Sequence, residues 1–547
     1  MSDDRPAVSK STPGAGGPGA APRPRTAAPP TRDRTGGRWL AVSTAVILVA
    51  ALSPCLRAFG TPRGFHFWGA TWFAPDDGLL LSVMWEGVRG HWLHTPPYAL
   101  ADGPGAFFYP GYLLLGHLSR WTGLDPIIVF YLARFACGAT LLVSLHGFVG
   151  RFFDRREDRR FAFLVAATGG GLGWLAATAF LSRSVEFSAP EAYPFFSILA
   201  SAHFPLAAAA LLWVLDALVP GAGGSPSATA VRAPGPAAWA RFVAGVVILA
   251  FMQPFGSVVA FCLGAFCASA RWARERRLPR AELAGLIVLG AFTALVARHQ
   301  ITTIASNPAF VGWRTQVRTP TPPPGQLLVA IGLVLPFAIP GLVAAARRRG
   351  PDDLLLLGWI GTLIVLLSLP YYQARRFDLA GYVPLAILAV RGVGTLRLRW
   401  SGTDRSFAVL LNALSGVLLV WGTTGRISGL DPELFMREER WAAVRYLRDH
   451  APERAVVLAE PVTSLSLLAS SPLRVVYGHR TENPRAAETR RAVQAFFDSS
   501  RALDASLMSR VDYVLVERHP GAPRPPVPPE FRRVFVRGSV SVFERRR

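Results

Sequence analysis

The sequence predicts a polytopic α-helical membrane protein with a small α/β domain outside the membrane at the C-terminal end. Hydrophobic residues make up 51% of the 547 residues, and charged residues only 17%. Apolar runs long enough to cross ~30 Å of hydrocarbon as helices recur along most of the chain. From about residue 431, the composition changes to short segments typical of strands and helices. A soluble enzyme, a disulfide-rich secreted module and a disordered chain are therefore excluded.

The net charge of +23 does not indicate a nucleic-acid-binding protein. Almost every cation is arginine, Lys10 being the one lysine, and the arginines cluster between apolar runs, where the positive-inside rule expects them. The four cysteines lie in apolar segments with no C-x-x-C pair, so we interpret them as small buried apolar residues.

Residues 1–38 are rich in Pro, Gly, Ala and Arg, which predicts a disordered tail. The first apolar run, 39–59, follows Arg32, Arg34 and Arg38, so the tail is expected in the cytoplasm. We interpret this run as a retained first span rather than a signal peptide, because no A-x-A cleavage site follows it.

Further spans are expected at 126–150, 161–182, 193–219, 281–298, 325–345, 353–370, 378–396 and 406–425. The stretch 240–271 has Gln253-Pro254 at its middle and arginines on both flanks. A proline-broken hairpin of two helices would return both flanks to the cytoplasm. The total is then about eleven spans, with the N-terminus cytoplasmic and the C-terminal domain on the external, periplasmic face of a plasma membrane.

Two segments are expected outside the membrane. The first external loop, 60–124, contains an apolar stretch too short to span, which suits a position along the interface. The C-terminal domain, 428–547, is predicted to alternate helices with strands. Its expected helices are Glu438–His450 and Ala486–Asp498, and its expected strands are 455–460, 474–478 and 511–517. Residues 534–544 are expected to form a terminal strand or a hairpin.

The first external loop contains the adjacent carboxylates Asp76 and Asp77. Neighbouring carboxylates repel each other, so such a pair suits a proton acceptor with an orienting partner, or a site for a divalent cation. A solvated turn or a helix N-terminus, where acids complement the helix dipole, is an equally good interpretation. The spacing of His91 and His94 could suit a metal, but no third ligand stands near them.

Other polar groups of the expected outer loops are candidate substrate contacts. Arg375 and Arg376 could hold a phosphate, because guanidinium forks match phosphate oxygens; pairing with lipid headgroups or with Asp378 is the alternative. His203 falls inside the fourth expected span, where an ionisable residue is a functional candidate by default. The outer loops also contain the carboxylates Glu186 and Glu191.

Several short motifs match a known family pattern. In the first loop and second span they are Asp76-Asp77, Trp85-Glu86-Gly87, Tyr109-Pro110-Gly111-Tyr112 through Leu115-Gly116, and Tyr131-Leu132-Ala133-Arg134. Further along they are the glycine-rich run 169–174, Ala202-His203-Phe204-Pro205, Gln253-Pro254, Arg376 ahead of Pro384-Leu385-Ala386, Gly478-His479-Arg480-Thr481-Glu482, and Val511-Asp512-Tyr513-Val514. With these motifs the chain resembles the GT-C superfamily of polytopic glycosyltransferases over roughly 39–547.

The resemblance implies transfer of a sugar from a polyprenyl-phosphate donor to a glycan, lipid or protein acceptor on the outer face of the membrane. In the superfamily an acid of the first loop acts as base or holds a metal, which corresponds here to Asp76 or Asp77. An acid of the second loop corresponds to Glu186 or Glu191. Glu86 and His479 lie in matched motifs and are added as expected substrate contacts; His479 could equally belong to a tight structural turn.

Two functions follow from these observations. The first is a glycosyltransferase, in which Asp76 or Asp77 deprotonates the acceptor and Arg375 or Arg376 holds the donor phosphate. The second is a non-catalytic lipid or glycan carrier, or an assembly scaffold that keeps the GT-C frame, because family membership does not by itself establish catalysis. A geometric test separates them: for a transferase, Asp76 or Asp77 should line a pocket open to the outer leaflet, within about 10–15 Å of an outer arginine.

Overall fold

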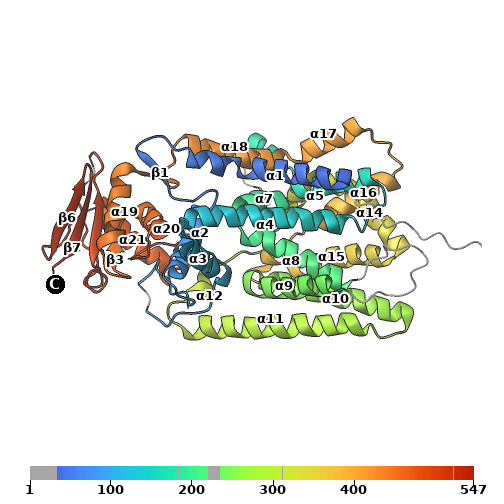
Figure 1. Ribbon diagram of the computed structural model, residues 1–547, viewed down its shortest axis with the longest axis horizontal. Helices are drawn as coiled ribbons and strands as arrows, with labels where there is room; N and C mark the ends of the chain where they lie inside the picture. The colour runs from blue at the N-terminus through green and yellow to red at the C-terminus, as the bar shows by residue number, and fades with distance from the viewer. Residues whose placement is uncertain are drawn as a thin grey trace, which may run out of the picture.

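The computed structural model describes residues 34–100, 102–180, 184–219, 235–310, 312–499, 501–521 and 523–546. A long helical bundle has a small domain of strands and helices at one end, and the C-terminus lies at that end (Figure 1). The first helix, α1 (Arg34–Phe59), already begins at Arg34, so the last residues of the expected tail are helical. Residues 1–33 of that tail lie outside the described residues.

The bundle is made of helices that surround one large apolar core. After α1 they are α4 (Pro126–Val149), α5 (Arg156–Thr168), α6 (Gly173–Phe180), α7 (Pro194–Ala200), α8 (His203–Leu218), α9 (Pro236–Met252), α10 (Pro254–Glu275), α11 (Arg280–Ser306), α12 (Trp313–Gln316), α13 (Pro324–Ile331), α14 (Leu335–Arg348), α15 (Pro351–Leu367), α16 (Tyr382–Thr395), α17 (Gly402–Asn412) and α18 (Leu414–Ser428). Three 3₁₀ turns join them, namely η1 (Val185–Phe187), η2 (Gly332–Val334) and η3 (Ala374–Phe377).

Within the described residues, six helices are long and apolar enough to cross a membrane, or seven if the pair α17 and α18, bent by 46°, forms one span. Fewer helices than the expected eleven or so spans are therefore both long and apolar enough to pass this test. Each of the other expected spans is helical, but α8, α9, α15 and α16 have 17 residues or fewer. Apolar periodicity located these helices, several of which are shorter than the 18 residues that the length test requires.

The expected break at Gln253-Pro254 is confirmed. Helix α9 ends at Met252 and α10 begins at Pro254, while Gln253 has φ −147° and ψ 70°, outside the helical region. Proline lacks the N–H that continues a helix and disfavours helical geometry in the residue before it. The two helices pack against each other, as a hairpin requires.

The first external loop contains β1 (Phe65–Phe67), α2 (Ala74–Val88) and α3 (Pro110–Thr122). Helix α3 exposes Leu114, Leu118 and Trp121 at 49%, 42% and 66%. A short helix with such an apolar face suits the membrane interface, as the sequence predicts.

The C-terminal domain is a five-stranded sheet with strand order β4-β3-β5-β7-β6. Its strands are β3 (Val456–Leu458), β4 (Arg474–Val475), β5 (Tyr513–Glu517), β6 (Phe531–Arg537) and β7 (Val540–Arg545). Strand β3 runs parallel to β4 and β5, and β7 is antiparallel to β5 and β6. The helices are α19 (Glu438–His450), α20 (Pro461–Ser470), α21 (Ala486–Asp498) and α22 (Ala505–Met508). Helix α20 is absent from the elements expected from the sequence.

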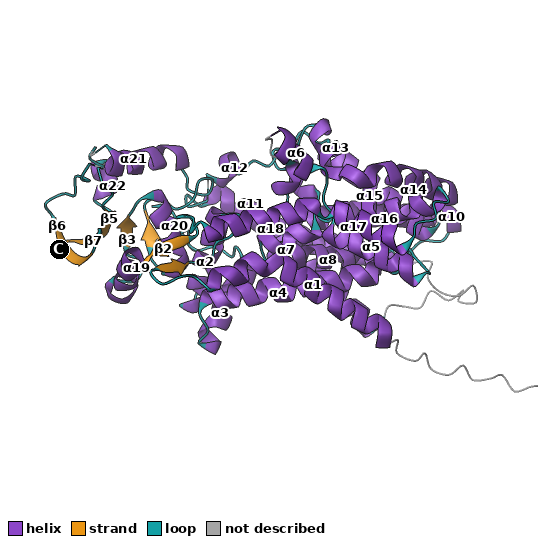
Figure 2. Cartoon of the chain, turned by 90° about the horizontal axis from the view of Figure 1, so that it is seen from above, coloured by secondary structure: helices purple, strands orange, loops and turns teal. Residues whose placement is uncertain are grey.

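The first external loop and the C-terminal domain share one apolar core. Strand β1 pairs antiparallel with β2 (Phe435–Arg437), and the N–H groups of Val475 and Gly478 donate to the carbonyls of Pro97 and Tyr98 at 2.8 and 3.0 Å. Helix α2 packs on α20, and Figure 2 shows both between the strands and the bundle. The expected boundary at residue 428 thus separates two parts of the sequence that pack together in one apolar core.

Candidate active site

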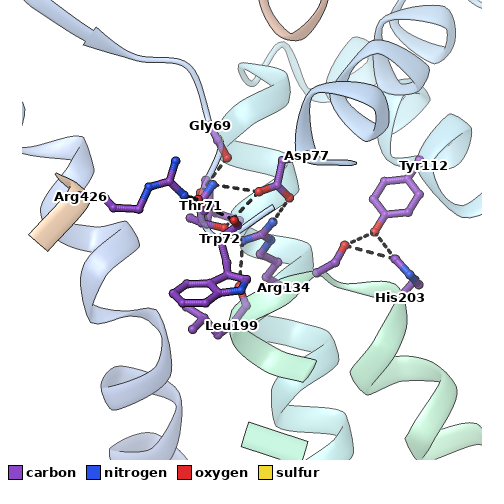
Figure 3. Close-up of polar contacts among 11 residues, drawn as sticks. Gly69, Thr71, Trp72, Asp77, Tyr112, Arg134, Leu199, His203 and Arg426 are labelled. Carbon is purple, nitrogen blue, oxygen red and sulfur yellow. Dashed lines mark hydrogen bonds and ion pairs between the residues drawn. The ribbon is translucent and has the colours of Figure 1, made fainter. Parts of the chain in front are cut away.

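The two adjacent acids of the first loop have different environments. Asp77 is 1% exposed and forms an ion pair with Arg134 of α4. The backbone N–H and the hydroxyl of Thr71 donate to its Oδ2 at 2.9 and 3.1 Å, as Figure 3 shows. Burial raises the pKa of Asp77 to about 6, so it is still ionised at neutral pH. Asp77 therefore fixes the start of α2 on α4, and both of its oxygens are occupied.

Asp76, one residue earlier, has a side chain that is 65% exposed. Its Oδ1 lies 3.3 Å from Nε2 of His479 in the C-terminal domain. Burial acts to raise the pKa of Asp76, but the hydrogen bond from His479 and the charges of Arg480 and Arg376 outweigh it and lower the pKa. Asp76 is thus an ionised carboxylate at the place where the loop, the domain and the bundle meet.

Two arginines near Asp76 have no acidic partner within the described part of the chain. Arg376 of η3 lies over the ring of Phe255, with its guanidinium carbon 5.8 Å from the ring centroid. Arg480 follows His479 in the same turn and is exposed. Both are close enough to lower the pKa of Asp76. An exposed carboxylate beside two uncompensated guanidinium groups can accept a proton on one side and bind an anion on the other.

His203 is the first residue of α8 rather than a residue in the middle of a span, which corrects the expected position. The preceding helix, α7, ends at Ala200, so the expected fourth span is broken just before the imidazole. The Nδ1 atom of His203 lies 2.9 Å from the hydroxyl of Tyr112 and 3.2 Å from that of Ser201. Asp76 and Arg376 both interact electrostatically with His203, so it belongs to the same site.

Arg375 differs from Arg376. Its Nε donates to Oε1 of Glu191 at 3.1 Å, and the Glu191 side chain is 3% exposed. The expected phosphate ligand Arg375 and the expected second-loop acid Glu191 therefore neutralise each other. The contact fastens η3 to the segment before α7 and leaves Arg376 as the available cation of the Arg375-Arg376 pair.

Glu186 lies in an enclosed junction of broken helices. Its Oε1 accepts from the N–H of Gly173 at 2.9 Å and from the hydroxyl of Ser415, and its Oε2 accepts from the hydroxyl of Ser184 at 3.2 Å. A hydrogen bond links the two helix breaks at this junction, one between α5 and α6 and the other between α13 and α14. The N–H of Leu172 donates to the carbonyl of Val329 at 2.8 Å. Glu186 is 2% exposed, and burial raises its pKa to about 6.

Glu86 lies near the other end of α2 and is 7% exposed. Burial raises its pKa, while the charges of Arg454 and Arg89 oppose that shift. The structure does not bring Glu86 to Asp76, so of the expected site residues it assembles Asp76, His203, Arg376 and His479.

The expected cation site does not fit the geometry. Asp77 turns both oxygens toward Thr71 and Arg134, away from any ion that Asp76 could hold. In the described ranges, no group of three His, Cys, Asp or Glu side chains is placed to hold a metal ion. The carboxylate pair is therefore not a shared ligand set.

Two residues of this site, Arg134 and Glu482, have no role in the predictions made from the sequence. Arg134 belongs to a matched motif, and a charged residue within an expected span is itself a signal of a buried partner. Glu482 accepts hydrogen bonds from the hydroxyls of Tyr98 and Tyr109 at 3.1 and 3.0 Å. No spacing rule relates this glutamate to residues about 380 positions earlier.

The chain is similar in structure to three solved proteins. The Archaeoglobus fulgidus oligosaccharyltransferase in the apo form matches 89% of this chain and 70% of its own, at 13% identity and a TM-score of 0.50. The arabinofuranosyltransferase AftD from Mycobacteria matches 93% of this chain and 40% of its own, at 15% identity and a TM-score of 0.52. ArnT from Cupriavidus metallidurans bound to undecaprenyl phosphate matches 93% of this chain and 98% of its own, at 12% identity and a TM-score of 0.48.

No protein-family profile matches the sequence, and no curated protein matches it. The first two structural matches establish the fold over about nine-tenths of the chain. The mostly helical bundle, its apolar spans and the small C-terminal sheet agree with that fold. The chain is therefore an integral membrane protein with the GT-C fold of polytopic glycosyltransferases.

Proposed function

We propose that this protein is a membrane glycosyltransferase that moves a sugar from a polyprenyl-phosphate donor to a hydroxyl of a glycan, lipid or protein acceptor. The observation that carries the proposal is the exposed, ionised Asp76 beside Arg376 and Arg480. An isolated acid at a helix N-terminus would not need two cations without acidic partners. The fold shared with an oligosaccharyltransferase and an arabinofuranosyltransferase supports sugar transfer as the class of reaction.

In the proposed reaction the acceptor oxygen attacks the anomeric carbon of the donor sugar. The bond from that carbon to the phosphate oxygen breaks, and polyprenyl phosphate leaves with the electron pair. Asp76 takes the proton of the acceptor hydroxyl as the new bond forms. Its lowered pKa makes it a weak base at rest, so proton transfer is expected to accompany bond formation rather than precede it.

The leaving phosphate gains negative charge in the transition state, and fixed cations stabilise that charge. Arg376 is the first candidate, because Arg375 beside it is already paired with Glu191. Arg480 brings a second guanidinium from the C-terminal domain. His203 interacts electrostatically with Arg376, and its Nδ1 lies 2.9 Å from the hydroxyl of Tyr112; both side chains can donate hydrogen bonds to phosphate or sugar oxygens.

We place the reaction on the outer face of the membrane, with the N-terminus cytoplasmic and the C-terminal domain outside. The basic connections after α4, α10 and α14 lie at the end of the bundle opposite the C-terminal domain (Figure 1). The positive-inside rule assigns that end to the cytoplasm. The Asp76 site at the other end then faces the outer leaflet, where a polyprenyl-linked donor can enter sideways.

The test uses the purified full-length protein in liposomes with a panel of polyprenyl-phosphate sugars and a mixture of acceptor glycans. Asp76→Asn should lower transfer about 100-fold or more, because a general base typically contributes that much. Asp102→Asn is the matched control, because Asp102 is also an acid of the first loop, is 71% exposed, and pairs with Arg510 in the C-terminal domain. Full transfer by Asp76→Asn would refute the mechanism. Donor binding without transfer by the wild-type protein would instead support the carrier function.

A further inference from the structure

We propose that His479 is a positioning residue that orients Asp76, so that the C-terminal domain completes the active site. The inference rests on the proposed function only in naming Asp76 as the reacting carboxylate. The contact joins residues 403 positions apart and crosses from the C-terminal domain to the start of α2. The His479 side chain is 3% exposed and that of Asp76 is 65% exposed, so the imidazole lies behind the carboxylate.

Backbone groups select the tautomer of His479. The N–H groups of Glu482 and Thr481 lie 3.2 and 3.4 Å from Nδ1, and the Thr481 hydroxyl lies 3.4 Å from it. Because backbone N–H groups can only donate, Nδ1 must be the acceptor, and the proton of the neutral ring resides on Nε2. Nε2–H then donates to Oδ1 of Asp76. Neutral His479 can therefore hold the carboxylate without becoming charged.

The turn that carries His479 is itself anchored on the first loop. Glu482 accepts hydrogen bonds from Tyr98 and Tyr109, and the side-chain amide of Asn483 donates to the carbonyl of Tyr98 at 3.3 Å. The backbone of Tyr109 has φ +53°, a left-handed conformation that is uncommon for residues other than glycine. Such a conformation persists where surrounding contacts determine it, and these positions cluster at functional sites.

In this arrangement one carboxylate oxygen of Asp76 is hydrogen-bonded to His479, and the other can interact with a substrate. Within the described residues, Oδ1 contacts His479, and no hydrogen-bond partner is found for Oδ2. Arg376 and Arg480 are the cations that act on Asp76, and Asp77 and Glu482 are carboxylates that interact with it. Glu482 and Arg480 also act on His479. Fixing one oxygen sets the direction of the other, which is the oxygen that must meet the acceptor hydroxyl.

The test compares three substitutions in the full-length protein. The side-chain amide of Gln can reach the position of Nε2, whereas that of Asn reaches only the position of Nδ1, and Ala donates nothing. His479→Gln should keep most of the wild-type kcat. His479→Asn and His479→Ala should lose about 10- to 100-fold in kcat, the size expected for one hydrogen bond to a charged group. The donor KM should stay within about twofold, because the phosphate contacts are unchanged.

The positioning role would be overturned if His479→Gln lost as much kcat as His479→Ala. It would also be overturned if all three variants kept the full wild-type kcat. A change confined to the donor or acceptor KM would instead make His479 a substrate contact and would also overturn it. A purely structural role would lower the folded yield of His479→Ala without this selective rescue by Gln.

A second readout does not depend on activity. Nitrogen NMR of histidine-labelled protein in nanodiscs reports the tautomer of His479, with His479→Gln used to assign its signals. The wild type should show a neutral ring protonated on Nε2, and Asp76→Asn should shift that nitrogen. Absence of the shift overturns the contact even if the protein transfers sugar. A clear shift in a protein without transferase activity would instead refute the proposed function and keep the contact.

Discussion

Asp76 and Glu186 are two acids outside the long helices, and they differ in the groups that surround their carboxylates. Glu186 is enclosed, and hydroxyls and a backbone N–H from three different segments donate to it. Asp76 is exposed on one side, and among the described residues His479 is its one side-chain donor, with two arginines nearby. The carboxyl group of Glu186 uses its oxygens in hydrogen bonds that hold the helix breaks together. The charge of Asp76 remains available to a substrate.

Asp77 provides a third case that sharpens this comparison. It is as enclosed as Glu186, but its charge is balanced by a buried cation, Arg134. Burial together with a complete set of partners therefore marks the structural acids of this protein. Exposure together with uncompensated cations marks the candidate reacting acid. The comparison makes three predictions, each of which can contradict it.

The largest effect on stability is expected from Arg134→Gln. Removing the cation leaves Asp77 as an uncompensated buried charge, which costs about 3–5 kcal/mol. The folded fraction in detergent, followed by size-exclusion chromatography on heating, should fall sharply. Arg120→Gln, at an exposed position of α3, should behave as wild type. An Arg134→Gln protein as stable as wild type would show that Asp77 is not held as we describe.

A smaller, pH-dependent effect is expected from Glu186→Gln. The pKa of Glu186 is raised from 4.5 to about 6 in the folded protein, so folding favours the protonated carboxyl. Its contribution to stability is fully present below pH 4.5 and is lost as the pH rises through 6, an amount of about 2 kcal/mol. Glutamine does not titrate, so the stability difference between wild type and variant should change by that amount across this window. Sugar transfer per folded molecule should stay within about twofold of wild type; a large loss would place Glu186 in the reaction.

The smallest effect is expected from Arg376→Lys. Lysine keeps the charge but loses the two-pronged contact that a guanidinium makes with phosphate. A loss of about 1 kcal/mol would raise the donor KM roughly fivefold, with kcat less affected. Arg63→Lys, at an exposed position of the first loop, is the control. An unchanged KM would indicate that the donor phosphate binds elsewhere.

The sequence predicts the fold class, the helix positions, the break at Gln253-Pro254 and most of the C-terminal domain, because these features follow from local periodicity and proline chemistry. The lengths of the individual helices are harder to predict, because apolar runs do not show where a helix ends. The short serine-rich helix α20 has no strong local signal and is held by packing on α2.

The division of roles between Asp76 and Asp77 could not be predicted from the sequence. The two residues have the same neighbours in the sequence, and residues far along the chain determine whether each carboxylate is buried and paired or exposed. Arg134 lies 57 positions after Asp77, and His479 lies 403 positions after Asp76. The same applies to Arg375 and Arg376, because Glu191, 184 positions before Arg375, removes one of them from the site.

The pairing of β1 with β2 has a consequence for biosynthesis. The ring of His66 contacts Glu438, 372 residues further along the chain. At a synthesis rate of about 5–20 residues per second, roughly 20–70 s separate the emergence of the two segments. During that interval the first loop lacks the apolar partners that the C-terminal domain provides, and we expect the nascent protein to depend on a chaperone until translation ends.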